Sequence, residues 1–254
     1  MSYLEQLFSL HGRTALVTGA RTGLGAAIAG ALAGAGADLV LLGHGGDLSA
    51  VCQQVEAHGR RASVVEVELL EPDRVAGAAA AILAEHRIDI LVNNAGTIRR
   101  APAEGHALAD WRAVFAVNVD SLFELTRALV PPMLHRRSGK IINIASILSC
   151  HGGTMVSGYT ASKHAVLGLT RAWANEWAPH NVQVNAIAPG FFDTDNTAPL
   201  RADPRAYRQT LTRIPAGRWG DPPDLAGAAV FLAGPGSDYV SGHALAVDGG
   251  WLAF

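Results

Sequence analysis

The sequence predicts an α/β fold in which seven parallel strands form a doubly wound sheet with helices on both faces. Segments with the pattern of buried strands alternate with segments of helical periodicity along the whole chain. Such alternation implies right-handed strand–helix–strand crossovers and a parallel sheet covered on both sides. The chain has 254 residues, of which 49% are hydrophobic, so we expect one substantial core and a single domain over residues 1–254.

The expected strands are short apolar runs, and the expected helices are longer segments with one apolar face. Strands are predicted at 13–18, 38–42, 62–69, 89–92, 140–145, 182–187 and 244–247. Helices are predicted at 24–35, 48–58, 72–86, 110–134, 159–178 and 222–233. Residues 191–214, called the lid segment below, are polar, irregular and rich in proline, which is typical of a loop that covers a site. The order of elements is that of a Rossmann-like domain.

Composition and charge argue against several classes of function. The net charge is -2 at pH 7 and no run of Lys or Arg exceeds two residues, so we expect no nucleic-acid or membrane partner. The first ten residues lack the pattern of a secretory signal. Cys52 and Cys150 form no CxxC pair, which suits a reducing compartment, and we expect a cytoplasmic protein. The ten histidines show no paired ligand spacing, so no metal is expected.

A glycine-rich turn, TGARTGLG at 18–25, lies between the first strand and the first helix. Gly19 permits a tight turn, Gly23 lets the backbone approach a pyrophosphate, and Gly25 lets the helix pack closely on the strand. The N–H groups at the start of the helix then face an anion, with the helix dipole behind them. The turn therefore predicts a dinucleotide site, with the spacing TGxxxGxG in place of GxGxxG.

Further motifs follow in order along the chain. They are NNAG at 93–96, Asn118, Ser146, a YxxxK pair formed by Tyr159 and Lys163, and Pro189-Gly190 after the sixth strand. With the turn at 18–25, they resemble the short-chain dehydrogenase/reductase family over essentially the whole chain. The resemblance implies an NAD(P)-dependent enzyme that interconverts a secondary hydroxyl and a ketone, with Asn118, Ser146, Tyr159 and Lys163 as its catalytic residues.

A narrower resemblance involves NAGTIRR at 94–100, ANEWA at 174–178, RIPAGRWG at 213–220 and DGGWLA at 248–253. These segments resemble the 2-deoxy-D-gluconate 3-dehydrogenase (2-keto-3-deoxy-D-gluconate oxidoreductase) subfamily, which implies a C6 sugar acid as substrate. The chain departs from that subfamily at Met155, which stands in the place of an arginine. Two alternatives therefore stay open. One is a reductase of the same family for a keto-acyl, steroid or polyol substrate, and the other is a cofactor-sensing protein without turnover.

The spacing of Tyr159 and Lys163 predicts a proton-transfer pair. The two residues are four positions apart, so on a helix both point to the same side. A free tyrosine with a pKa of about 10 is a poor base at neutral pH, and we expect the Lys163 ammonium to lower that pKa. Ser146 is expected to donate a hydrogen bond to the substrate oxygen. The resemblance implies that Asn118 holds a water beside Lys163, and that Lys163 also binds the cofactor ribose.

The expected cofactor is NAD, with NADP as the alternative. The end of the second strand carries neither the acid typical of NAD enzymes nor a cluster of arginines. Arg21 is either a contact to the 2′-phosphate of NADP or a solvated turn residue. The expected cofactor contacts are Gly19, Arg21, Thr22, Gly23, Leu24, His44, Glu68, Leu69, Asn94, Ala95, Gly96, Tyr159, Lys163, Pro189, Gly190, Phe192 and Thr194.

The substrate side is predicted around two adjacent arginines. Arg99 and Arg100 follow the fourth strand, and arginine binds carboxylates through two parallel hydrogen bonds. The expected substrate contacts are Arg99, Arg100, Ser146, His151, Met155 and Tyr159. We also expect a homotetramer, because Trp173, Trp177 and the apolar terminus at 251–254 exceed what one sheet face needs, and because the resemblance implies assembly through these helices.

Overall fold

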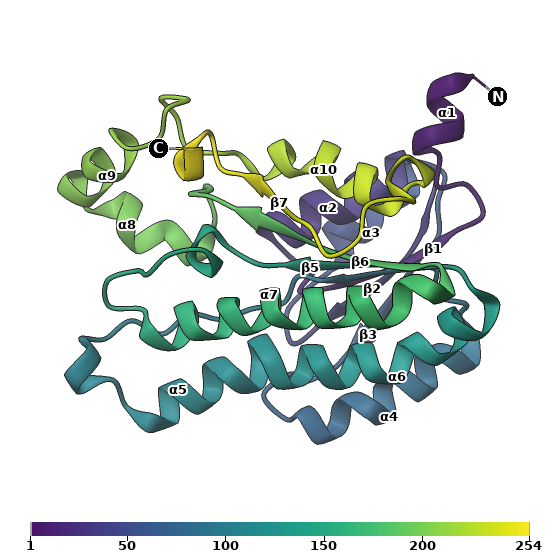
Figure 1. Ribbon diagram of the computed structural model, residues 1–254, viewed down its shortest axis with the longest axis horizontal. Helices are drawn as coiled ribbons and strands as arrows, with labels where there is room; N and C mark the ends of the chain where they lie inside the picture. The colour runs from purple at the N-terminus through teal and green to yellow at the C-terminus, as the bar shows by residue number, and fades with distance from the viewer. Residues whose placement is uncertain (1, 254) are drawn as a thin grey trace.

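The computed structural model describes residues 2–253 and confirms the predicted seven-stranded parallel sheet (Figure 1). The strands lie in the order β3-β2-β1-β4-β5-β6-β7. They are β1 (Thr14–Thr18), β2 (Asp38–Gly43), β3 (Ala62–Glu66), β4 (Ile90–Asn93), β5 (Gly139–Ile144), β6 (Val182–Pro189) and β7 (Ala244–Val247). Because the strand order reverses between β1 and β4, a crevice opens at their carboxyl ends, where ligands enter folds of this kind.

Helices cover both faces of this sheet. Within residues 2–253 they are α1 (Tyr3–Phe8), α2 (Gly23–Gly34), α3 (Ser49–Ala57), α4 (Pro72–Glu85), α5 (Leu108–Phe115), α6 (Ser121–Arg136), α7 (Ser157–Trp177), α8 (Ala198–Ala202), α9 (Pro204–Leu211) and α10 (Ala226–Ala233). Figure 1 shows α2, α3 and α10 on one side of the sheet and α4, α6 and α7 on the other. The short helices α8 and α9 lie beyond one end of the sheet, near the C-terminus.

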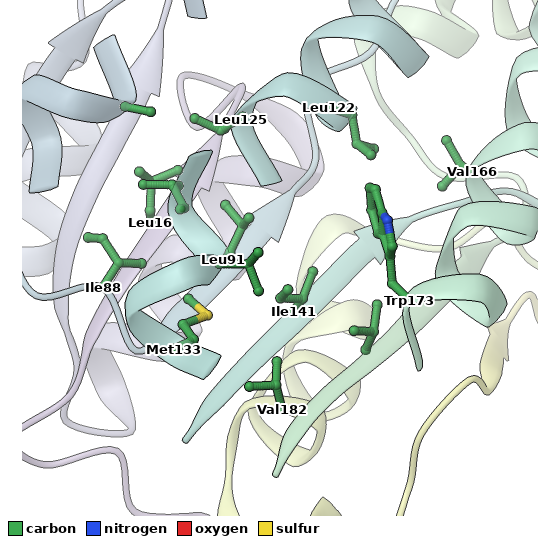
Figure 2. Close-up of a cluster of buried hydrophobic side chains, with 14 of the residues drawn as sticks. Leu16, Ile88, Leu91, Leu122, Leu125, Met133, Ile141, Val166, Trp173 and Val182 are labelled. Carbon is green, nitrogen blue, oxygen red and sulfur yellow. The ribbon is translucent and has the colours of Figure 1, made fainter. Parts of the chain in front are cut away.

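Two buried cores follow from the alternation of side chains along the strands. Leu16 and Leu91 point toward α4, α6 and α7, whereas Val17 of β1 packs against α2 and α10. Figure 2 shows the first core, in which Met133 of α6 and Trp173 of α7 lie close to the strands. Each buried aliphatic side chain of this kind contributes about 2 kcal/mol of hydrophobic free energy. The sheet is therefore a rigid base for the residues at its carboxyl edge.

Buried polar side chains tie the helices to that edge. The side-chain amide of Asn93 donates to Thr126 Oγ1 at 3.0 Å and to Asn143 Oδ1 at 2.9 Å. Asn143 in turn donates to Thr170 Oγ1 of α7 at 2.9 Å. These bonds link β4 and β5 to α6 and α7, and a buried polar group left without its partner would cost about 1–3 kcal/mol. The network fixes the position of α7 against the sheet.

Some predicted boundaries differ from the structure. The helix expected at 110–134 is divided into α5 and α6 by a π-helical turn, η2 (Ala116–Asp120), a feature that often marks a functional site. The strand expected at 62–69 ends at Glu66, because its partner β2 ends at Gly43, the residue paired with Glu66. The lid segment contains α8 and α9, which its proline content concealed, and α1 was not predicted.

The tryptophans assigned to subunit contacts pack within the chain itself. Trp173 and Trp177 are each 7% exposed, and their stacked ring centroids are 5.2 Å apart. Trp251 is buried against Ile214 and Trp219 of the segment that follows β6. These tryptophans are therefore buried within the chain itself, so they are not evidence for contacts between subunits. Phe254, the last of the apolar terminal residues, lies outside the described residues.

No helix within residues 2–253 is both long and apolar enough to cross a membrane. Nor does any group of three His, Cys, Asp or Glu side chains in the same range lie close enough to hold a metal ion.

Candidate active site

The glycine turn after β1 forms a cradle for an anion. The backbone φ angles of Gly19 and Gly23 are 62° and 57°, in the left-handed region that favours glycine. A Cβ atom on Gly25 would lie 2.2 Å from the carbonyl oxygen of Gly19, so no larger residue fits there. Thr22 caps α2 without a side-chain bond to its first turn. The residues present therefore fit a dinucleotide pyrophosphate at the start of α2.

The turn is held by the loop that follows β4. The side-chain amide of Asn94 donates to the carbonyl oxygens of Thr18 at 2.8 Å and Gly19 at 3.0 Å. Thr18 Oγ1 accepts hydrogen bonds from the backbone N–H groups of Asn94 and Ala95, both at 2.9 Å. These reciprocal bonds lock the two loops on either side of the crevice. Asn94 thus shapes the cradle through its side chain as well as lining it.

The first turns of α7 bring Tyr159 and Lys163 to the carboxyl end of β5. Lys163 is 4% exposed, and its Nζ donates to the carbonyl oxygen of Ile144 at 2.6 Å. The same Nζ lies 5.7 Å from the centre of the Tyr159 ring. Ser146, two positions after the end of β5, lies near enough to Tyr159 to lower the pKa of the phenol, and its Oγ accepts a hydrogen bond from the N–H of Leu148 at 3.1 Å. The structure therefore brings together three residues separated by up to 17 positions in the sequence.

The electrostatics of Tyr159 differ from the prediction. Burial raises the pKa of Tyr159, although the hydrogen bond from Ser146 and the positive charge of Arg100 act in the opposite direction. From the sequence we predicted that Lys163 lowers the pKa of Tyr159. That prediction is wrong in direction, because the pKa of Tyr159 is raised. Burial also lowers the pKa of Lys163 to about 8. Burial of Tyr159 and Lys163 away from water explains why these pKa values differ from the prediction. The spacing of the two residues does not reveal their burial.

Asn118 lies in the π-helical turn and joins three elements. Its Oδ1 accepts from the N–H of Thr97 at 2.8 Å, and its Nδ2 donates to the Thr97 carbonyl at 3.0 Å. The Nδ2 group also donates to Ser162 Oγ on α7 at 3.0 Å. The extra residue of a π-turn directs this buried side chain toward α7. Asn118 therefore connects the loop after β4 to the residue that precedes Lys163.

Two serines that the sequence analysis did not identify support the site. Ser149 Oγ donates to the backbone carbonyl of Lys163 at 2.8 Å and accepts from the N–H of Ser146 at 3.2 Å. Ser162 Oγ donates to the carbonyl of Tyr159 at 2.7 Å. Their proximity to Ser146 and Lys163 in the sequence was only a weak indication of this role.

A cavity of about 350 Å³ lies over the glycine turn and contains Ser146, Tyr159 and Lys163 on its wall. The other predicted residues that line it are Gly19, Arg21, Thr22, Gly23, Leu24, Asn94, Ala95, Gly96, Pro189, Gly190, Phe192 and Thr194. Asp195, Asn196 and Thr197 of the lid segment also line the cavity and were not predicted. Thr194 lies directly over Gly23, 3.4 Å from where a Cβ atom would be.

A second hollow adjoins this cavity and shares Gly19, Arg21, Thr22, Ala95 and Gly96 with it. The predicted residues His44, Glu68 and Leu69 line its outer part. His44 Nε2 lies 2.8 Å from Glu68 Oε2, which ties the loop after β2 to the loop after β3. Together the two hollows contain every residue predicted to contact the cofactor.

The two adjacent arginines are held by different partners. Arg99 donates to Thr97 Oγ1 at 3.0 Å, lies 3.6 Å from Asp110, and lines the outer hollow beside His44. Arg100 instead donates to the carbonyl oxygen of Asn196 in the lid segment at 3.1 Å. Only Arg100 is therefore placed beside the cavity that contains Tyr159.

His151 and Met155 are not among the residues that line this cavity. His151 Nε2 accepts a hydrogen bond from Trp251 Nε1 at 3.0 Å, which ties the loop after β5 to the C-terminal segment. Met155 is 48% exposed and lines a separate hollow with Pro102 and Ala103. Its φ of 64° is unusual for a residue with a side chain. The substrate contacts predicted for these two residues remain predictions.

A family model described as enoyl-(acyl carrier protein) reductase matches residues 19–252. The chain belongs to the short-chain dehydrogenase/reductase family. The predicted NAD(P)-dependent oxidoreductase activity is thereby confirmed at the level of the family.

Several short-chain dehydrogenases named for sugar acids are similar over their full length. The 2-dehydro-3-deoxy-D-gluconate 5-dehydrogenase of Bacillus subtilis (strain 168) is 53% identical over 253 residues, which cover 100% of both chains. The protein of the same name from Escherichia coli (strain K12) is 49% identical over 97% of this chain and 98% of its own length. The predicted resemblance to sugar-acid oxidoreductases is confirmed, although these relatives are named for carbon 5 rather than carbon 3.

A solved short-chain dehydrogenase structure agrees with this relationship. It is a gluconate 5-dehydrogenase from Burkholderia cenocepacia J2315 in complex with NADP and tartrate. Its TM-score is 0.95 at 37% identity, and the match covers 99% of this chain and 100% of that one.

The buried ammonium of Lys163 leads to a prediction about stability. Below pH 8 the folded chain holds a buried charge that the unfolded chain exposes to water, and the resulting destabilisation disappears as the pH rises from about 8 to 10.5. We expect Lys163→Met to raise the free energy of unfolding at pH 7 by about 2 kcal/mol, after allowance for the lost bond to Ile144. Urea denaturation at pH 7 and pH 10 measures this gain, which should shrink at pH 10. A variant less stable than the wild type at both values would contradict the prediction.

Proposed function

We propose that the protein interconverts a secondary hydroxyl and a ketone at carbon 5 of a C6 sugar acid, with 2-dehydro-3-deoxy-D-gluconate or gluconate as the substrate type. The observation that carries this proposal is that Tyr159, Ser146 and the buried Lys163 line one cavity together with the glycine turn, with Lys163 Nζ 5.7 Å from the centre of the Tyr159 ring. The full-length relatives named 2-dehydro-3-deoxy-D-gluconate 5-dehydrogenase support the choice of substrate and carbon.

Tyr159 is the acid and base of the proposed reaction. Oxidation of the hydroxyl removes a hydride from carbon and a proton from oxygen, and a bound nicotinamide dinucleotide supplies the acceptor for the hydride. Tyr159 takes the proton, and in the reverse direction it donates that proton to the ketone oxygen. Because burial raises its pKa, Tyr159 is protonated at neutral pH and is ready to donate. The arrangement therefore favours reduction near neutrality and oxidation at higher pH.

The other predicted catalytic residues hold Tyr159 and the substrate oxygen in place. Ser146 donates a hydrogen bond to the oxygen on which charge develops. In this proposal Lys163 supplies a positive charge beside the phenol and binds ribose hydroxyls of the dinucleotide through its ammonium. Asn118 orients this part of α7 through Ser162. We also propose that Asn118 holds a water molecule beside Lys163.

The cofactor site suits both NAD and NADP. β2 ends at Gly43 without an acidic residue of its own, although the carboxylates of Glu66 and Glu68 reach this edge from the end of β3, at 3.3 Å from the N–H of Gly45 and 2.8 Å from His44 Nε2. Arg21 lies beside Gly46 at the same edge, 2.9 Å from where a Cβ atom on Gly46 would be. The gluconate 5-dehydrogenase with bound NADP supports the use of NADP by this chain. We propose Arg21 as the contact to the 2′-phosphate.

We also propose that the protein assembles as a homotetramer through α6 and α7. Phe123 is 38% exposed and lies in a surface hollow with Leu169, Ala165 and Gly168 of α7. The small residues Ala165 and Gly168 allow a helix of another copy to approach closely. The tetramer is therefore proposed from this hollow and not from Trp173 and Trp177, which are buried within the chain.

Replacement of Tyr159 tests the proposed chemistry. We expect Tyr159→Phe to lower kcat at least about 100-fold, because the proton has no donor or acceptor. Cofactor affinity should change far less, since the ring remains in place. Absorbance at 340 nm measures turnover, and fluorescence titration measures cofactor binding. Tyr239→Phe, on the fully exposed Tyr239, is the matched control. A wild-type protein that binds cofactor but turns over no sugar acid, polyol or diketone would contradict the proposal.

Replacement of Arg21 tests the assignment of the 2′-phosphate contact. We expect Arg21→Ala to weaken NADPH binding roughly tenfold or more and to leave NADH binding nearly unchanged, because only NADPH carries the extra phosphate. Calorimetric titration of both cofactors measures the two constants. Arg112→Ala, on the exposed side of α5, controls for loss of a positive charge. Equal weakening of both cofactors by Arg21→Ala would count against the assignment.

Light scattering tests the proposed assembly. The wild type should have four times the mass of one chain at micromolar concentration, and Phe123→Glu should lower that mass because it replaces the exposed apolar ring with a negative charge in a hollow that Asp73, Asp120 and Glu124 also line. Leu108→Glu changes a residue that is 61% exposed and lies outside the hollow, and it should leave the mass unchanged. A monomeric wild type would refute the tetramer.

A further inference from the structure

Lys163 is bound at two points to the segment that carries Ser146. Its Nζ donates to the carbonyl oxygen of Ile144, the last residue of β5, at 2.6 Å. Its backbone carbonyl accepts a hydrogen bond from Ser149 Oγ at 2.8 Å. In the sequence, Ser146 lies between Ile144 and Ser149. The side chain and the backbone of one residue on α7 therefore hold the loop after β5 on both sides of Ser146.

The hydroxyl of Ser149 also holds the backbone of Ser146. Ser149 is 4% exposed, and its Oγ accepts a hydrogen bond from the N–H of Ser146 at 3.2 Å. A hydroxyl can accept and donate at once, so this bond is compatible with the bond that Ser149 donates to Lys163. A buried N–H or hydroxyl that loses its partner is costly, which keeps both bonds formed. Ser149 therefore joins the backbones of Ser146 and Lys163 through a single oxygen atom.

The turn that Ser149 holds also sets the direction of the Ser146 hydroxyl. This turn is η3 (Ile147–Ser149), in which the N–H of Ser149 donates to the Ser146 carbonyl oxygen at 2.9 Å. Ser146 Oγ accepts a hydrogen bond from the N–H of Leu148 at 3.1 Å, so its own hydrogen can donate to a group in the cavity that contains Tyr159. The direction of this donor therefore depends on where the turn lies.

We propose that Ser149 is a positioning residue, which fixes the Ser146 hydroxyl relative to Lys163 so that it donates to the substrate oxygen. Ser149 is not among the residues that line the cavity, so it acts through Ser146 and not by contact with the substrate. A displacement of about 1 Å in a catalytic group can lower the rate by about 100-fold. The inference rests on the proposed function, which supplies the reaction, and it adds a residue outside the motifs identified in the sequence.

A double-mutant cycle with Ser146 tests this role. Steady-state rates with 2-dehydro-3-deoxy-D-gluconate and NAD or NADP are measured for the wild type, Ser149→Ala, Ser146→Ala and the double variant. We expect Ser149→Ala to lower kcat roughly 10-fold, because the donor is misplaced, and Ser146→Ala to lower it roughly 100-fold or more, because the donor is removed. In the Ser146→Ala background, Ser149→Ala should lower kcat by less than about twofold, since no donor remains to be misplaced.

Two further variants separate positioning from a general loss of stability. Ser149→Thr keeps the hydroxyl and should restore most of the wild-type kcat. Ser237 is the matched control, because it is fully buried and its Oγ donates to the carbonyl oxygen of Leu232 at 3.0 Å. It contacts Lys140 at the opposite end of β5 from the cavity. Ser237→Ala should lower the urea midpoint of unfolding about as much as Ser149→Ala and leave kcat unchanged. Dinucleotide affinity, measured by fluorescence titration, should change little in the Ser149 variants, since the glycine turn is intact.

The outcomes distinguish failure of this inference from failure of the proposed function. A wild type that oxidises neither 2-dehydro-3-deoxy-D-gluconate nor gluconate would refute the proposed function, and the inference with it. An active wild type whose kcat is unchanged in Ser149→Ala would overturn the inference alone. Equal effects of Ser149→Ala in the wild-type and Ser146→Ala backgrounds would also overturn it, since they would show an action independent of Ser146. If Ser149→Ala does not fold, Ser149→Cys, which has a similar size and a weaker donor, takes its place in the cycle.

Discussion

The active site depends on one buried charge. The ammonium of Lys163 is almost completely removed from water and is held by a hydrogen bond to the carbonyl oxygen of Ile144 at the end of β5. A charge in this position is costly, and its pKa falls to about 8 as a result. The surrounding structure over-determines the position of α7: Ser149 bonds to the backbone of Lys163, and Asn118 bonds to Ser162. Contacts with the rigid edge of the sheet thus keep the Lys163 ammonium buried, although removing it from water is unfavourable.

Around that charge, the site combines groups with opposite effects on proton transfer. Burial keeps the proton on Tyr159, whereas Ser146 and Arg100 favour its release. The lid segment contributes through Asn196, whose carbonyl holds the guanidinium.

Much of the fold and the cofactor site could be predicted from the sequence, because both depend on periodic or local patterns. Alternation of apolar runs predicted all seven strands, and the positive φ angles of Gly19 and Gly23 follow from their place in the turn. The predictions that were wrong concerned features that depend on the three-dimensional surroundings of a residue. The apolar positions at 110–134 were compatible with one uninterrupted helix and did not indicate the π-turn at Asn118, and Trp173 is as apolar in a core as at an interface. The pKa of Tyr159 reflects loss of water, which spacing does not encode.

The most direct test of the central claim is a titration of Lys163 itself. Lysine side chains labelled with ¹⁵N are followed by NMR from pH 6 to pH 11, and the Lys163 signal is assigned by its absence in Lys163→Met. The account predicts a midpoint of about 8, well below the 10.5 of a lysine in water. A midpoint at or above 10.5 would show that the ammonium is solvated or fully compensated, and it would contradict the buried charge on which this description of the site depends.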